Sequence, residues 1–254
     1  MKRIAAAALV LAAAVVAAAD GYDPPEVRYE NTPYNGRFTF VRMRFRPSDW
    51  GPGRYEWGLD LKWNHDYPRA EAHFTKILQE LTTLDPNTGG GNILGFDDPE
   101  LLKYPVAYLS EPGYWIPSEQ EAAGLRNYLA KGGFLIVDDF MQNEWYNFET
   151  QIRRALPWAQ IRRLDLSHPI FDSFFRISTL DMSYPTPGLQ WLKAEFFGIF
   201  EDNDPAKRLV VVINYNNDIG DYMEWSGTAG WWPVNITNEA YKLAINYIVY
   251  GLTR

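Results

Sequence analysis

The chain has 254 residues, 46% of them hydrophobic and 22% charged, a balance typical of a folded globular protein and not of a disordered one. Its 24 Lys and Arg are outnumbered by 32 Asp and Glu, giving a formal net charge of -8, so nucleic acid and anionic membranes are not expected partners. The complete lack of cysteine excludes disulfides, thiolate nucleophiles, iron–sulfur clusters and cysteine-bound zinc.

The first 19 residues have the three parts of a secretory signal peptide. Lys2 and Arg3 precede an apolar stretch, and three alanines at 17–19 fit the small-residue cleavage site. The alternative is an uncleaved anchor, but the apolar run over 4–19 is shorter than the roughly 17–25 residues of a spanning helix. We therefore expect cleavage, no membrane span in the mature chain, and export to the periplasm or the extracellular space.

Strand and helix patterns begin after the leader. An alternating strand is predicted over 38–45, followed by a loop over 46–62 that is rich in Pro, Gly and Trp. A helix is predicted over 67–84, and a loop with consecutive glycines over 87–92 lacks the Lys and Ser/Thr of a phosphate loop. The apolar face of the predicted helix consists of Ala70, Phe74, Ile77, Leu78 and Leu81.

The middle of the chain continues this alternation. A short buried strand is predicted over 106–110. The next helix, over 118–131, starts with a capping box formed by Ser118 and Glu121. The strand over 134–137 is continuously apolar, as expected for a strand that helices cover on both faces.

The last part of the chain ends in a long helix. The predicted elements are a helix over 144–156, a weak strand over 161–164, a short helix over 167–175, strands over 195–200 and 209–214, and a helix over 238–252. This alternation predicts an α/β sandwich with a mostly parallel sheet. We expect an N-terminal extension over 20–37 and a single domain over 38–254, with an excursion from its sheet near 176–208.

Two carboxylates follow the continuously apolar strand. Asp138 and Asp139 stand at its carboxyl end, and ligands bind at this edge of an open parallel sheet. The pair could hold a hard metal cation or act as acid and base in catalysis. The alternative is that one carboxylate caps the next turn and the other is solvated.

Two of the 3 histidines stand where a sheet's carboxyl edge is expected. His65, followed by Asp66, precedes the first long helix, and His168 follows a predicted strand. Each is a candidate acid, base or ligand, or else the cap of a local turn. His73 lies within a helix and is interpreted as structural. The chain has no His-x-x-x-His pair, so support for zinc is weak, and no cofactor is predicted.

A polar segment follows the strand over 209–214. Its oxygen-bearing candidates for binding a ligand are Asn216, Asp218, Asp221 and Glu224, and Trp225 comes next. Their spacing differs from the calcium-binding loop of an EF-hand. A structural turn held by Asn and Asp side chains explains the segment equally well.

Six of the 10 tryptophans fall in two clusters. One cluster consists of Trp50, Trp57 and Trp63, and the other of Trp225, Trp231 and Trp232. Exposed rings of this kind stack on sugars or anchor protein partners, whereas buried rings pack loops onto a core. We favour packing.

Several motifs occur in a characteristic order over about 38–253. They are WNHDYP at 63–68, EPGYW at 111–115, the stretch over 125–140 that ends in DDF, HPIF at 168–171, the polar segment over 216–225 and INYIVY at 245–250. In this order they resemble the motifs of a bacterial family called domain of unknown function 4159. Tyr215 and Met223 stand where His and Trp are common in that family, which puts in doubt any mechanism with a third histidine in the cleft.

The resemblance implies a flavodoxin-like, three-layer α/β sandwich similar to the class I glutamine amidotransferases, in proteins that are mostly exported or membrane-associated. Amidotransferase chemistry needs a cysteine on a sharp turn after a strand, so the lack of cysteine excludes it here. The corresponding position after the strand over 106–110 begins with Glu111. We include Glu111 and Trp115 among the candidate ligand-binding residues.

Two functions are compatible with these patterns. The first is an exported, non-catalytic domain that binds a ligand or a protein partner in the cell envelope. The alternative is a hydrolase based on carboxylates and histidine, with or without a metal, that acts on a glycan or another envelope substrate. The hydrolase requires that four side chains meet in one cleft: His65, Asp138, His168 and Asp218.

Overall fold

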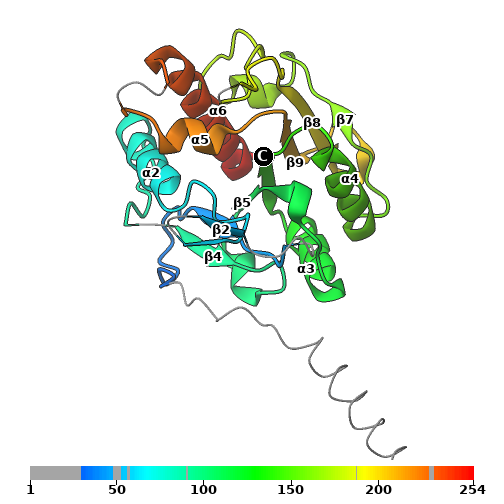
Figure 1. The fold of residues 1–254 in the computed structure, drawn as a ribbon. Helices are drawn as coiled ribbons and strands as arrows, with labels where there is room; N and C mark the ends of the chain where they lie inside the picture. Colours follow the sequence, from blue (N-terminus) through cyan, green and yellow to red (C-terminus); the bar gives the residue numbers. More distant parts are fainter. Residues whose placement is uncertain (1–29, 48–52, 56–57, 90, 187, 229–231) are drawn as a thin grey trace, which may run out of the picture. The chain divides into compact units, whose positions relative to one another are not determined.

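The computed structural model describes residues 30–47, 53–55, 58–89, 91–186, 188–228 and 232–254. Residues Asn31–Arg254 form one compact unit around a seven-stranded sheet (Figure 1). The strands of this sheet are β1 (Val41–Met43), β4 (Asn92–Leu94), β5 (Val106–Ser110), β6 (Phe134–Asp138), β7 (Arg162–Arg163), β8 (Glu195–Phe200) and β9 (Leu209–Tyr215). A separate hairpin consists of β2 (Gly53–Tyr55) and β3 (Gly58–Asp60).

The strands of the central sheet follow the order β4-β1-β5-β6-β9-β8-β7. The first five are parallel, and β8 and β7 join at one side as antiparallel strands. The parallel part has the flavodoxin order, because the chain leaves β1 for β4 on one side and then returns to β5 on the other. The predicted mostly parallel sheet is confirmed, and the carboxyl ends of its five parallel strands share one edge.

Helices cover both faces of this sheet. They are α2 (Arg69–Leu81), α3 (Glu119–Ala130), α4 (Glu144–Ala155), α5 (Ile219–Glu224) and α6 (Val234–Thr253). Helices α2, α5 and α6 pack together on one face, and α3 and α4 pack together on the other (Figure 1). This arrangement confirms the three-layer sandwich. Among the described residues, no helix combines the length and the apolar character needed to cross a membrane.

The hydrophobic core lies on both sides of the central strands. All five residues of β6 are buried, as the unbroken apolar pattern predicts. Phe134 and Ile136 belong to the same core cluster as Ile245 of α6. On α2, the predicted face is buried at Ala70, Phe74 and Leu78 and partly buried at Ile77, whereas Leu81, the last helical residue, is half exposed.

Parts of the structure differ from the sequence patterns. The strand β4 begins at the end of the predicted glycine-rich loop and is only three residues long, too short to show a periodicity. The helix α5 lies in the polar segment that indicated ligands or a turn, and it has only six residues. The strand β8 has the predicted bounds, 195–200, but it pairs with β9 in the central sheet and so does not belong to the excursion expected near 176–208.

Candidate functional site

A cleft of about 830 Å³ opens at the carboxyl edge of the parallel strands. Its described lining includes two basic groups, Lys62 and His65, and many carboxylates. The acidic lining residues are Asp66, Glu111, Asp139, Glu144, Asp218, Asp221 and Glu224. This excess of acid in a concave site indicates a cationic ligand.

The acidic residues reach the cleft from separate loops. Glu111 directly follows β5, and Asp139 directly follows β6. Asp66 lies between β3 and α2, and Asp218 caps the N-terminus of α5 after β9. The flavodoxin strand order therefore brings together residues that are far apart in sequence, at the edge where such folds bind ligands.

Three of these residues have a left-handed backbone, which is uncommon for residues other than glycine. The φ angles are 62° at Asp66, 52° at Glu111 and 60° at Asp139. Glu111 thus occupies a sharp turn directly after the buried strand β5. Backbone outliers of this kind cluster at functional sites, which motivates a functional interpretation of the three acids.

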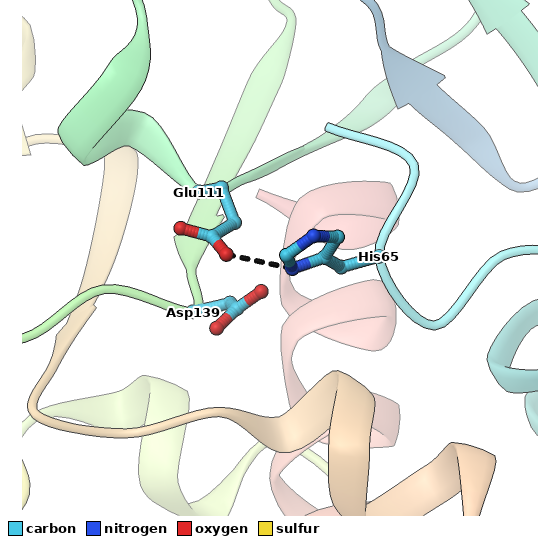
Figure 2. Close-up of side chains that lie close together, drawn as sticks. All are labelled: His65, Glu111 and Asp139. Atoms are coloured by element: carbon cyan, nitrogen blue, oxygen red, sulfur yellow. Dashed lines mark ion pairs between the residues drawn. The ribbon is translucent and has the colours of Figure 1, made fainter. Parts of the chain in front are cut away.

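His65 lies between two carboxylates. Its Nε2 is 3.0 Å from Asp60 Oδ1, and its Nδ1 is 2.7 Å from Glu111 Oε1. Figure 2 shows Glu111 and His65 facing each other, with the carboxylate of Asp139 beside them. Because carboxylate oxygens accept hydrogen bonds, both ring nitrogens donate when the histidine is protonated.

The surroundings of His65 and Glu111 raise the pKa values of both groups. Burial disfavours the imidazolium, but the hydrogen bond and the charge of Glu111 outweigh it and raise the pKa of His65 to about 9. Burial and the charge of Asp139 also raise the pKa of Glu111, to about 8. Both groups therefore hold protons more tightly than the same side chains do in water, close to the wall of the cleft.

Asp66, Asp139 and Asp218 form the inner part of the cleft. One oxygen from each lies within 4.8 Å of the others, a spacing that one cation can span with metal–oxygen bonds of about 2.0–2.6 Å. Asp139 accepts hydrogen bonds from Ser110 Oγ at 3.0 Å and Tyr184 Oη at 3.2 Å. Asp66 Oδ2 is buried and has no hydrogen-bond partner among the described residues.

The carboxylates of the inner cleft repel one another, and this repulsion raises their pKa values. Burial and the charge of Asp139 raise the pKa of both Asp66 and Asp218 well above the usual aspartate range. The same two causes raise the pKa of Asp221 to about 7. Without a bound cation, these groups must take up protons or remain in unfavourable proximity.

The cleft contains three overlapping groups of metal-ligand type within the described residues. Each group has its ligand atoms within 4.8 Å of one another. The groups are His65–Glu111–Asp139, Asp66–Asp139–Asp218 and Asp66–Asp221–Glu224. Asp139 belongs to the first two and Asp66 to the last two, so the three groups are continuous.

Asp138, a candidate acid or metal ligand in the sequence, is fully buried and does not line the cleft. Its Oδ2 accepts hydrogen bonds from Tyr108 Oη at 2.8 Å and from the amides of Ile219 and Gly220. Its Oδ1 accepts one from Asn214 Nδ2 at 2.9 Å. Asp138 therefore joins the sheet to the start of α5, whereas its neighbour Asp139 faces the cleft.

The variant Asp138→Asn is expected to destabilise the fold and leave cation binding by the folded protein intact. An asparagine presents an amide to donors that require an acceptor, which costs on the order of 2 kcal/mol and lowers Tm by roughly 5 °C. Burial raises the pKa of Asp138 to about 7, so thermal unfolding at pH 8, above this value, measures the first effect, and calorimetric titration with Mn²⁺ measures the second. A variant that keeps its Tm but loses the cation would instead place Asp138 in the site.

His168 lies outside the cleft. It caps the short helix over Pro169–Asp172, where its Nδ1 accepts a hydrogen bond from the Ile170 amide at 3.2 Å. Its ring packs against Phe200 and Tyr250. Burial lowers the pKa of His168, so this histidine is neutral at pH 7. Of the four side chains that the hydrolase was expected to bring together in one cleft, only His65 and Asp218 line it.

The remaining sequence candidates divide between cleft and scaffold. Asp221, Glu224 and Trp225 line the cleft, and the Arg69 guanidinium lies 5.0 Å from the centre of the Trp225 ring. Trp115 is fully buried and does not line it. Asn216 is also buried, and its Oδ1 accepts a hydrogen bond from the Gln142 amide at 3.0 Å.

The structure describes the side chains of three of the six clustered tryptophans. Trp63 is buried in the core, and Trp232 packs partly buried against it. Trp225 is half-buried in the wall of the cleft. The side chains of Trp50, Trp57 and Trp231 lie outside the described residues.

Sequence reasoning missed two residues that shape the site. Asp60 orients His65 from the end of the hairpin, and Tyr184 donates to Asp139 from the segment between η3 (Pro169–Asp172) and β8. Asp60 lies only five positions before His65, so its negative charge could have indicated a partner for this histidine. Tyr184 lies in a stretch without periodicity, and no local pattern marks it.

Comparison with known proteins confirms the family that the sequence resembles. The model of a family described as a domain of unknown function (DUF4159) matches residues 53–252, which include every acidic residue of the cleft. No curated protein matches the chain.

Proposed function

The chain belongs to the DUF4159 family, and we propose that its cleft is a divalent-cation-dependent hydrolytic site. One observation carries the proposal. Three carboxylates from separate loops place their oxygens within 4.8 Å of one another, and a buried oxygen of Asp66 has no hydrogen-bond partner among the described residues. Oxygen ligands at this spacing suit Mg²⁺, Ca²⁺ or Mn²⁺.

Each residue of the cleft has a role in this proposal. Asp66, Asp139 and Asp218 would hold the cation, which would stabilise the negative charge that develops on a bound water and on the substrate oxygen beside it. The His65–Glu111 pair lies next to Asp139 and delivers its proton to the leaving group. Asp60 orients the imidazole through Nε2, in the manner of carboxylates that support catalytic histidines.

The test combines cation binding with hydrolysis by the purified protein. Calorimetric titration with Mn²⁺ and Mg²⁺ is followed by assays with p-nitrophenyl acetate, phosphate and N-acetylglucosaminide, each with and without EDTA. We expect EDTA-sensitive hydrolysis of one probe class. His65→Gln is expected to keep Mn²⁺ binding and to lower the rate by about 100-fold or more, because it removes the general acid.

Two results would contradict the proposed function. If the wild-type protein binds no divalent cation at concentrations up to about 1 mM, the range of the weakest protein calcium sites, the proposal falls. If His65→Gln hydrolyses the probe at the wild-type rate, the role of the His65–Glu111 pair falls.

Binding without catalysis is the second candidate, and one observation favours it. Both ring nitrogens of His65 face carboxylates, so the histidine is held in the manner of a structural ion pair. In this case the cation would anchor an acidic group of a cell-envelope partner or a glycan. Two results together would favour this candidate. The protein would bind the cation but be inactive on all three probe classes, and it would capture an envelope component only when the cation is present.

We propose that either function is exercised outside the cytoplasm, because of the sequence pattern over 1–19. Its positive start, apolar stretch and terminal alanines are the features of a cleaved signal peptide. N-terminal sequencing of the protein from a fractionated cell tests this assignment, and an intact Met1 in the cytoplasmic fraction would contradict it.

A further inference from the structure

The geometry points to a second cation in the cleft, held by Asp221, Glu224 and Asp66, so that Asp66 bridges two cations. The inference rests on the proposed function, because the first cation is the one held by Asp66, Asp139 and Asp218. The second group also has its ligand oxygens within 4.8 Å of one another. The site would take a pair of hard divalent cations such as Mn²⁺ or Mg²⁺.

The helix α5 explains why the two sites lie side by side. Asp218 is its N-cap, and Asp221 and Glu224 follow at intervals of three residues. Asp221 and Glu224, at this spacing, lie on one face of the helix, and Asp218 precedes them at its N-terminus. Asp66 belongs to both ligand groups.

Asp66 has the properties that a bridging ligand requires. A carboxylate has two oxygens, each able to bind a different cation. Asp66 Oδ2 is buried against α5, where a Cβ at position 220 would overlap it, and it accepts no hydrogen bond from the described residues. Gly220 thus leaves room for this oxygen, and its lone pairs remain available for a cation.

The two sites differ in their exposure to water. Asp139 and Asp218 are only 4% and 6% exposed, whereas Asp221 and Glu224, which belong to the outer group alone, are only partly buried. The charge of Arg69 also acts on Glu224 and competes with a cation there. The inner site should therefore fill first, and the outer site should fill at a higher cation concentration.

The test is a titration of the purified protein with Mn²⁺, monitored by calorimetry and by electron paramagnetic resonance. We expect two Mn²⁺ per chain in two steps, with the six-line spectrum of the first ion giving way to a spin-coupled spectrum at the second. Glu224→Gln, a change in a partly buried side chain, should bind one Mn²⁺ and show no coupling. Asp66→Asn should lose the coupled spectrum. Glu80→Gln, on the exposed side of α2, is the matched control and should behave as the wild type.

Each contrary result has a different meaning. A wild-type protein that binds one Mn²⁺ would overturn the second site and leave the proposed function standing. Two ions without coupling, both retained in Asp66→Asn, would overturn the bridge. Binding of no ion at all would overturn the proposed function and the second site together.

Discussion

Replacing Asp139 with asparagine is expected to lower the affinity of the cleft for Mn²⁺ by at least about 100-fold, because it removes a charged ligand that two of the three groups share. The same change should raise the Tm of the cation-free protein. Asp139 is 96% buried, and its charge raises the pKa of Glu111, Asp218 and Asp221, so the neutral amide relieves repulsion in the folded state.

Two measurements on one preparation check this pair of opposite effects. Calorimetry with Mn²⁺ gives the affinity, and thermal unfolding in EDTA gives the stability. Asp172→Asn is the matched control, because it makes the same chemical change at an exposed position outside the cleft and should alter neither quantity. A lower Tm in EDTA for Asp139→Asn would mean that its hydrogen bonds with Ser110 and Tyr184 matter more than the repulsion.

The cation-free protein is expected to lose stability as the pH rises from about 5 to 9. The pKa values of Asp221 and Glu111 are raised to about 7 and about 8 in the folded state, above the values of an unfolded chain. The folded state therefore binds more protons than the unfolded state over this range, and the stability present at low pH is lost as the pH passes these values. His65, with a pKa raised to about 9, acts in the same direction.

Thermal unfolding in EDTA at pH 5, 7 and 9 measures this loss, which we expect to reach roughly 5 °C or more in Tm. Saturating Mn²⁺ should restore the Tm, and the gain should be larger at pH 9 than at pH 5, because protons compete with the cation for the same oxygens. The lowered pKa of Asp60 acts in the opposite direction but only at more acidic pH. A Tm in EDTA that stays constant or rises toward pH 9 would contradict the repulsion described for the cleft.

The fold was largely predictable because its signals are local. The unbroken apolar run of β6 and the capping box at Ser118 are confirmed as the sequence patterns indicate. The helix α5 was missed because its six residues, two of them the acids Asp221 and Glu224, do not show an apolar face of their own. Its helical form depends on the cap at Asp218 and on packing against α2 and α6.

The candidate site was predictable only in part, because side-chain direction depends on tertiary structure. The pair Asp138 and Asp139 correctly indicated the sheet edge, but no pattern distinguishes the residue that faces the cleft. That distinction comes from the left-handed turn at Asp139 and from the donors that surround Asp138. Likewise, His168 matched the expectation for a cleft histidine in sequence position, yet the local turn engages its Nδ1.

The carboxylates of the cleft come from loops that are more than a hundred residues apart in the chain, from Asp66 to Asp218. No short segment can assemble these ligands, so the site exists only when β1, β5, β6 and β9 have all paired. A cation bound there shifts the folding equilibrium by mass action toward the complete sandwich. The same ions proposed for chemistry would thus select for chains that have finished folding, and their concentration in the surrounding medium would set how much active protein is present.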